Sequence, residues 1–120
     1  METSVNNKCR AFTSLEQSKK LAKILPLQSA DMCYYNDGTA IKIDANPYPV
    51  RNSMWKDYYI GVIPCWSLAS LLGVLPSASL DSSDDHHYRI HCKERFTEWH
   101  DNAVDACVEM IVELKERGLL

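Results

Sequence analysis

Long hydrophobic segments are missing from this sequence. The longest apolar-rich stretch, residues 60–75, is interrupted by two glycines, a proline and two serines, and residues 1–10 contain no apolar run. A membrane-spanning helix needs about 20 consecutive apolar residues, and a secretory signal needs an apolar segment of about 7 to 15. We therefore expect a cytoplasmic protein that neither crosses nor enters a membrane.

Glycine is scarce as well, with 4 residues in a chain of 120. The sequence has no Gly-rich phosphate loop, no G-x-S-x-G elbow and no C-x-x-C pair, so nucleotide binding and a serine nucleophile are not indicated. His86, His87 and His91 are clustered, but His87 and His91 fall on a predicted strand about 13 Å apart, too far to share one zinc ion. We therefore expect no metal site and no cofactor.

Runs of Lys and Arg are absent too, and the formal net charge is −3. Nucleic-acid-binding domains owe most of their affinity to neutralised phosphates, so this balance argues against a nucleic-acid partner. Lys19, Lys20 and Lys23 share one face of the first predicted helix. They leave nucleic-acid binding open as the weakest of three functional hypotheses.

The five cysteines show no paired spacing. An odd count without a framework argues against disulfides, and all but Cys9 stand among apolar or aromatic neighbours, as buried reduced thiols commonly do. The pattern is typical of a protein from the reducing cytoplasm.

Three segments carry the signals of α-helices. A capping box at Thr13 predicts a helix that begins at residue 14. Pro64 suits a first helical position, and the leucines after it recur at helical spacing. Asn102 is the predicted N-cap of the last helix, which has one apolar stripe and ends at Gly118.

Two further segments predict β-hairpins. Residues 31–44 hold two strand-like stretches around an Asn-Asp-Gly turn, and residues 88–100 alternate around a Lys-Glu pair. Residues 45–56 and 77–85 are predicted as loops, because they are rich in Pro, Asn, Ser or Asp, and residues 58–63 are predicted as a short extended run before a helix.

The order helix, strand, strand, helix, strand, strand, helix indicates an α+β fold, with an antiparallel sheet that carries the helices on one face. We expect residues 1–120 to form a single domain, with residues 1–12 as a disordered leader. The periodicities point these residues into one core: Leu68, Leu71, Leu72, Ile90, Phe96, Cys107, Met110, Ile111 and Leu114.

Several segments resemble one protein family. They are Leu15 to Ser18, Ser29 to Met32, Ile63 to Leu72 and Val104 to Ile111. These segments are similar to a family of small uncharacterised proteins encoded by prophages and mobile elements of gut Bacteroides-type bacteria, and the likeness spans residues 12–120. The resemblance implies a genomic context rather than a chemistry, because that family has no assigned activity or catalytic residue.

Cys65 is the most suggestive single residue for catalysis. A helix that begins one residue earlier places this thiol in the first turn, where free backbone amides and the helix dipole favour a thiolate. His91 or His100 is then the candidate base, and Asp101 the group that orients it. The alternative is that Cys65 is a small packing residue beside Trp66.

Aromatic residues crowd the middle of the chain, where much of the sequence is predicted to be irregular. Tyr and Trp on loops serve either as lids over the core or as anchors for a partner protein, and both interpretations stay open. The candidate partner surface consists of Tyr34, Tyr35, Tyr48, Trp55, Tyr58 and Tyr59.

Two functional hypotheses of different classes lead. The first is a non-enzymatic protein-interaction module, an accessory protein of a phage or mobile element with an unknown protein partner. It follows from the lack of a catalytic motif, the aromatic middle segment and the family context. The second is a small cysteine-dependent enzyme with Cys65 as nucleophile. We also expect a homodimer, because two hairpins leave sheet edges that a second copy can cover.

Overall fold

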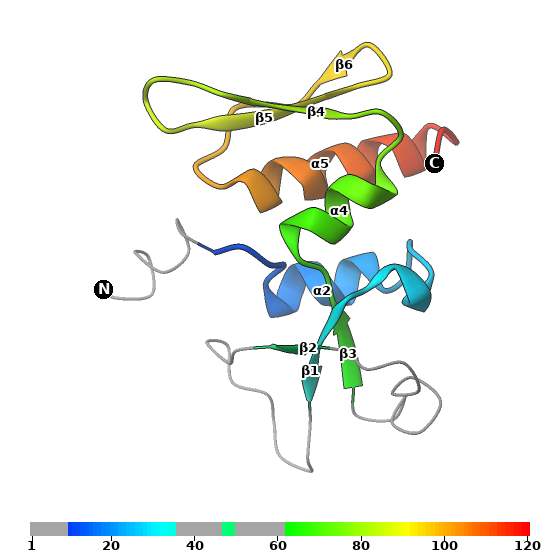
Figure 1. Ribbon diagram of the computed structural model, residues 1–120. Coiled ribbons are helices and arrows are strands. Elements are labelled where there is room, and N and C mark those ends of the chain that lie inside the picture. The colour runs from blue at the N-terminus through cyan, green and yellow to red at the C-terminus, as the bar shows by residue number, and fades with distance from the viewer. Residues whose placement is uncertain (1–9, 36–46, 50–61) are drawn as a thin grey trace.

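The computed structural model describes residues 10–35, 47–49 and 62–120 (Figure 1). The fold belongs to the α+β class, as the sequence predicts. In chain order the elements are α2 (Leu15–Leu21), η1 (Leu27–Ser29), β1 (Met32–Tyr35), β2 (Tyr48–Pro49), β3 (Val62–Cys65), α4 (Leu68–Val74), β4 (Ser79–Ser82), β5 (Tyr88–Cys92), β6 (Arg95–Phe96) and α5 (Ala103–Glu116). None of the described helices has the length and apolar character that a membrane crossing requires.

The strands form two separate three-stranded antiparallel sheets instead of the single sheet that we expected. β1 lies between β2 and β3 in the first sheet, and β5 lies between β4 and β6 in the second. Helix α4 follows β3 and precedes β4, so it carries the chain from one sheet to the other (Figure 1). A sequence pattern indicates strands but not their partners, which depend on packing with neighbouring elements.

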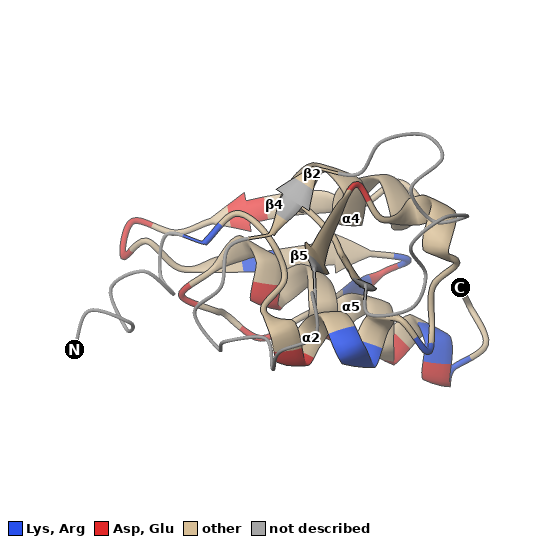
Figure 2. Ribbon diagram, turned by 90° about the horizontal axis from the view of Figure 1, so that it is seen from below, with Lys and Arg blue, Asp and Glu red and all other residues tan. Residues whose placement is uncertain are grey.

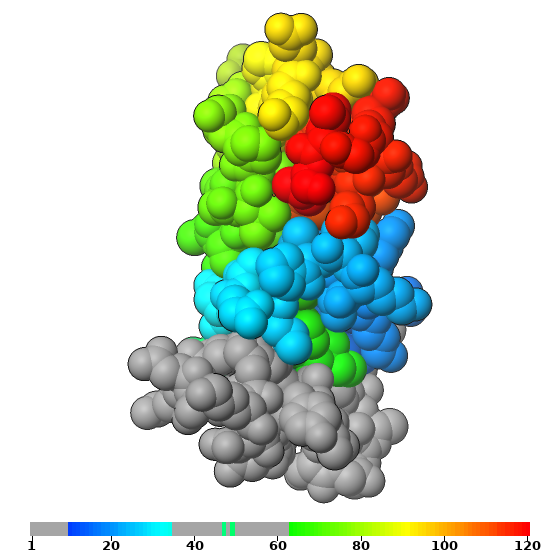
Figure 3. All heavy atoms as spheres, turned by 90° about the vertical axis from the view of Figure 1, so that its right-hand side faces the viewer, coloured from blue at the N-terminus to red at the C-terminus, as the bar shows by residue number. Residues whose placement is uncertain are grey.

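The elements are stacked in layers along the molecule. The β4–β5–β6 sheet covers α5 at one end, α4 and α2 follow, and the other sheet lies at the opposite end (Figure 1). In the space-filling view the same order runs from the β5–β6 region through α5 to α2 (Figure 3). Because α5 packs on only one face of the second sheet, the other face is covered by none of the helices that the structure describes.

Helix α5 is the centre of the core. Asn102 caps it as predicted, with Oδ1 accepting from the Val104 amide at 2.7 Å, and Gly118 follows its end with a φ of 71°. Its apolar stripe is buried against β5 and α4. The predicted core residues that belong to this core or pack against it are Leu68, Leu71, Leu72, Ile90, Cys107, Met110, Ile111 and Leu114.

Phe96 was predicted to lie in the core, but its side chain is 52% exposed. The turn at Lys93 and Glu94, which have positive φ values of 51° and 63°, places Phe96 directly opposite His91. His91 is on the outer face of β5, because its neighbours along the strand are buried on the inner face. The register set by the turn therefore puts Phe96 on the solvent side despite its hydrophobicity.

The predicted loop at residues 77–85 contains strand β4. Ser79–Ser82 pair with His91–Tyr88 of β5 without interruption. Serine and aspartate are depleted in strands, so the pairing with β5 imposes the extended conformation that local propensity does not favour.

Helix α2 begins one residue later than predicted. Its N-cap is Ser14, which forms the capping box with Gln17. Thr13, the predicted cap, is fully buried, and its hydroxyl accepts from the Trp66 amide at 3.1 Å and lies 2.8 Å from the Ser18 hydroxyl. Because these core contacts occupy the Thr13 side chain, the next residue caps the helix.

The N-terminal part of the chain differs from expectation in one respect. Residues 10–12 of the predicted leader pack on the fold, since Phe12 forms a β-bridge with Ser67 and Arg10 pairs with Asp105 at 2.7 Å. The first strand of the predicted 31–44 hairpin is β1, whereas its turn and second strand lie outside the described residues.

Candidate functional site

Cys65 is the last residue of β3 and not part of a helix. The predicted helix start at Pro64 is wrong, because Pro64 is paired in the sheet with Cys33 and α4 begins only at Leu68. The N-cap is Ser67, whose Oγ accepts from the amide of Ser70, and a serine cap is a stronger start signal than a proline. The prediction that the helix dipole acts on the Cys65 thiol is therefore wrong.

The Cys65 side chain is fully buried. Its Sγ lies 3.4 Å from both the hydroxyl and the carbonyl oxygen of Thr13, and the Tyr34 hydroxyl donates to the same carbonyl at 2.8 Å. Burial raises the pKa of the Cys65 thiol, although hydrogen bonds from Thr13, Ser18 and Tyr34 oppose that rise. The thiol is thus protonated at neutral pH and closed to a substrate, which disfavours a nucleophilic role.

The proposed base and orienting group do not meet Cys65. The His91 ring stacks on Phe96. His100 Nε2 lies 2.6 Å from a carboxylate oxygen of Glu109, and Asp101 is paired with His87 at 3.1 Å. The sequence could not show these separations, because they depend on which sheet each strand joins.

The predicted aromatic partner surface is described only at its start. Tyr34 is 3% exposed and cannot serve as an anchor, because its ring lies in the core beside Cys65. Tyr35 and Tyr48 lie in β1 and β2, and nothing is described of their side chains. Trp55, Tyr58 and Tyr59 fall outside the described residues.

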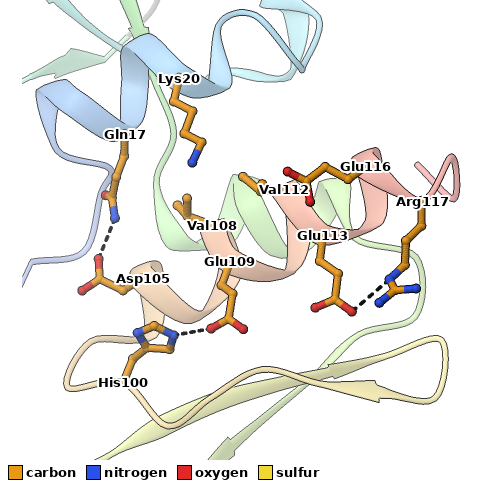
Figure 4. A pocket seen from close by; sticks show the side chains of 10 residues that line it. All are labelled: Gln17, Lys20, His100, Asp105, Val108, Glu109, Val112, Glu113, Glu116 and Arg117. Carbon is orange, nitrogen blue, oxygen red and sulfur yellow. Dashed lines mark hydrogen bonds and ion pairs between the residues drawn. The ribbon is translucent and has the colours of Figure 1, made fainter.

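A groove of about 730 Å³ runs between α2 and α5 (Figure 4). Most of its lining residues are charged: α2 contributes Lys20 and α5 contributes four carboxylates, which are among the basic and acidic residues that Figure 2 shows along these helices. The lining residues are Gln17, Lys20, His100, Asp105, Val108, Glu109, Val112, Glu113, Glu116 and Arg117.

Most charges of this groove are already paired. Asp105 accepts from Gln17 and Arg10 at 2.7 Å each, and Glu113 is bound by Arg117 at 3.3 Å. The close-up shows Gln17 of α2 turned toward Asp105, and Arg117 turned toward Glu113 (Figure 4). Most charges of the groove are therefore satisfied within the chain, and a ligand would have to break existing pairs to bind there.

The outer face of the β4–β5–β6 sheet carries a different group of side chains, which we call the aromatic platform and define as Arg89, His91, Phe96 and Trp99. The guanidinium carbon of Arg89 lies 4.3 Å from the ring centroid of Phe96 and 4.6 Å from that of Trp99. The His91 and Phe96 rings are stacked, with centroids 4.3 Å apart and planes inclined by 8°. Phe96 and Trp99 remain 52% and 44% exposed.

The sheet register assembles this platform. Arg89 stands opposite Asp81, and His91 stands opposite Phe96, so these residues share the face that α5 does not cover. Arg89 Nε donates to Asp81 Oδ2 at 3.1 Å. Within the described part of the chain nothing accepts from its two terminal nitrogens, so the guanidinium is held in place with donors to spare.

Hydrophobicity alone assigns Phe96 to the core, and for this reason the platform is not predicted from the sequence. A signal was present in the alternation of β5, where Arg89 and His91 alternate with the apolar Ile90 and Cys92. Combined with the two-residue turn, this alternation places Phe96 beside the polar residues.

Among the described residues, no three His, Cys, Asp or Glu side chains gather closely enough to hold a metal ion. Comparison of the chain with protein-family models, with curated proteins and with solved structures finds no match.

Proposed function

We propose that this protein is a non-enzymatic protein-interaction module and that the aromatic platform is its partner-binding surface. One observation carries the proposal: a partly exposed arginine is fixed against two exposed aromatic rings on the uncovered face of a sheet. Arg, Trp and Tyr dominate the binding energy of protein interfaces. Such a cluster in solvent is the pattern of a binding surface rather than of a core.

The fixed geometry also favours binding. An interface residue that is flexible before association loses side-chain entropy, at roughly 0.5 to 1.5 kcal/mol for each long side chain. Contacts with Phe96, Trp99 and Asp81 already hold Arg89, so little of that loss remains for the bound state. The platform is therefore pre-organised for a partner.

Nucleic acids are the competing partner, because bases stack on exposed aromatic rings of sheets. That mode also needs a basic groove for the phosphates, and here the Arg89 charge is matched by Asp81 in a chain of net charge −3. We therefore assign the platform to a protein partner.

The family resemblance supplies the setting of the proposal. The interaction would take place in the cytoplasm of a bacterium that carries a prophage or mobile element, with a host or phage protein as partner. The proposal includes a homodimer, because each of the two sheets has edge strands that a second copy can extend.

Site-specific photo-crosslinking tests the partner surface. A benzoylphenylalanine in place of Trp99 should link to a discrete protein in the native host. The same group in place of the exposed Lys115 on α5 should not. Equal crosslinking from both positions would contradict the proposal.

The captured protein is then purified and titrated against variants. Arg89→Ala should weaken binding by about 2 kcal/mol, or about thirtyfold, because it removes a hot-spot residue. Arg117→Ala is the matched control, since Arg117 is half-exposed and paired with Glu113 rather than with aromatic rings. Wild-type affinity in both Arg89→Ala and Trp99→Ala would overturn the proposal, as would micromolar binding of labelled single-stranded DNA or RNA that Trp99→Ala abolishes.

A further inference from the structure

Strand β4 is an edge strand of its sheet, with β5 on one side. Leu80 stands opposite Ile90, whose amide donates to the Thr97 hydroxyl at 2.9 Å and whose carbonyl accepts from the Thr97 amide at 3.0 Å. Since both backbone groups of Ile90 point away from β4, Leu80 and Ile90 form a non-hydrogen-bonded pair. The N–H and C=O groups of Leu80 therefore point outward at the free edge.

The same geometry holds one pair further along. Ser82 stands opposite Tyr88, and Tyr88 exchanges both of its backbone hydrogen bonds with His100 at 2.7 Å. The backbone groups of Ser82 thus also point outward, and by alternation those of Ala78 do so at the other end. Residues 78, 80 and 82 present a row of donors and acceptors that pair with no described strand.

This edge lacks the features that usually prevent strand pairing. Protected edges carry Lys, Pro, a bulge or an unpaired charge. β4 has neither Lys nor Pro, and its register with β5 runs without a bulge. Its one charge, Asp81, is neutralised by Arg89. Leu80 is 38% exposed on this strand.

We propose that two copies of the chain pair antiparallel along β4, with Leu80 of one copy directly opposite Leu80 of the other. This register forms hydrogen-bonded pairs between the two Leu80 residues and, in both directions, between Ala78 and Ser82. It brings the two exposed Leu80 side chains together. It also sets the Ser79 hydroxyl opposite the Asp81 carboxylate in both directions, as a two-fold interface requires.

The neighbouring registers are excluded by specific residues. The β4 strands of the two copies can shift past each other only by steps that keep their faces matched. The nearest alternative registers therefore place Asp81 opposite Asp81 or Ser79 opposite Ser79. Centring on Asp81 makes a non-hydrogen-bonded pair of two aspartates with side chains close together, and like charges there are destabilising. Centring on Ser79 draws in Ser77, whose φ of 52° is not that of a strand.

The pairing joins the β4–β5–β6 sheets of the two copies into one six-stranded sheet. Both aromatic platforms then lie on the same outer face. This inference rests on the homodimer of the proposed function, and it does not depend on what the platforms bind. The platform experiments and the dimer experiments can therefore fail separately.

Disulfide linking tests the register. All chains carry Cys9→Ser, because Cys9 lies outside the described residues. After mild oxidation Leu80→Cys should give a linked dimer, because the Cα atoms of such a pair are about 5.5 Å apart. Ser82→Cys alone should stay unlinked, but it should link when mixed with Ala78→Cys. Linking between Leu80→Cys and Ser82→Cys chains instead would place the centre at Asp81 and overturn the register.

Sedimentation equilibrium tests the dimer itself. The wild type should approach twice its 13.7 kDa mass as concentration rises. Leu80→Pro removes an outward N–H, which an edge strand tolerates, and should raise the dimer dissociation constant at least tenfold. Leu80→Ala keeps that N–H and should raise the dimer dissociation constant less. Far-UV circular dichroism checks that both variants are folded. A wild type that stays monomeric overturns the pairing and the homodimer together, and a dimer that Leu80→Cys does not link overturns the pairing alone.

Discussion

At the scale of single residues, access to solvent separates Cys65 from Arg89. The Cys65 thiol is surrounded by the hydroxyl groups of Thr13, Ser18 and Tyr34, where its hydrogen bonds are structural. Arg89 keeps about a third of its side chain exposed, with its planar head against two rings. A buried thiol and a fixed, partly exposed guanidinium suit different tasks, packing and recognition.

Alkylation kinetics test this assignment. Native Cys65 should react with N-ethylmaleimide at pH 6 to 8 no faster than Cys107, because burial raises the pKa of both thiols and reaction must wait for the chain to open. Peptide mass spectrometry resolves the two sites, and the urea-unfolded chain serves as the reference. Rapid modification of Cys65 near pH 6 would instead support the cysteine-enzyme hypothesis.

At the scale of elements, α5 and β6 show opposite relations between hydrophobicity and burial. The apolar stripe of α5 repeats over a helix of 14 residues, and its members are buried. β6 has two residues, too few to carry a pattern of its own, so its orientation follows from the turn before it. A long periodic element thus predicts its own buried face, and a short one does not.

Truncation of side chains in these two elements should have different costs. Met110→Ala and Leu114→Ala should each lower the free energy of unfolding by about 2 to 5 kcal/mol, because both side chains are fully buried. Phe96→Ala should cost less than about 1.5 kcal/mol, since half of the ring is already in solvent and the contacts with His91 and Arg89 are worth about that much. Urea unfolding measures all three variants. Equal losses in the free energy of unfolding would show that Phe96 belongs to the core.

At the scale of the whole molecule, one cluster of buried residues draws on α2, α4, β5 and α5. Cys33, Cys65, Cys92 and Cys107 are free thiols, all buried. Burial raises the pKa of Cys107 to about 12. Ionisation of such a thiol is therefore coupled to unfolding of the chain.

Stability should accordingly fall at alkaline pH. A thiol whose pKa is higher in the folded than in the unfolded chain makes its full contribution to the free energy of unfolding below the unfolded pKa near 9. That contribution is lost as pH rises toward 12. For Cys107 the expected loss is about 1.4 kcal/mol per pH unit in that window. Urea unfolding at pH 8 to 10.5 should show a shallower decline for Cys107→Ala than for the wild type, and identical slopes would show that Cys107 ionises as readily in the folded chain.

The amino-acid sequence by itself determined the α+β class, the extent of α5 with its Asn102 cap, and the tight turn at Lys93 and Glu94. These features depend on local periodicity, capping and turn chemistry, which short segments contain in full. Only the tertiary structure decided that the strands form two sheets, that Cys65 is closed off, and that Phe96 meets Arg89 on an open face. The physical reason is that strand pairing and burial are set by residues distant in sequence, as when β5 makes a strand of Ser79–Ser82.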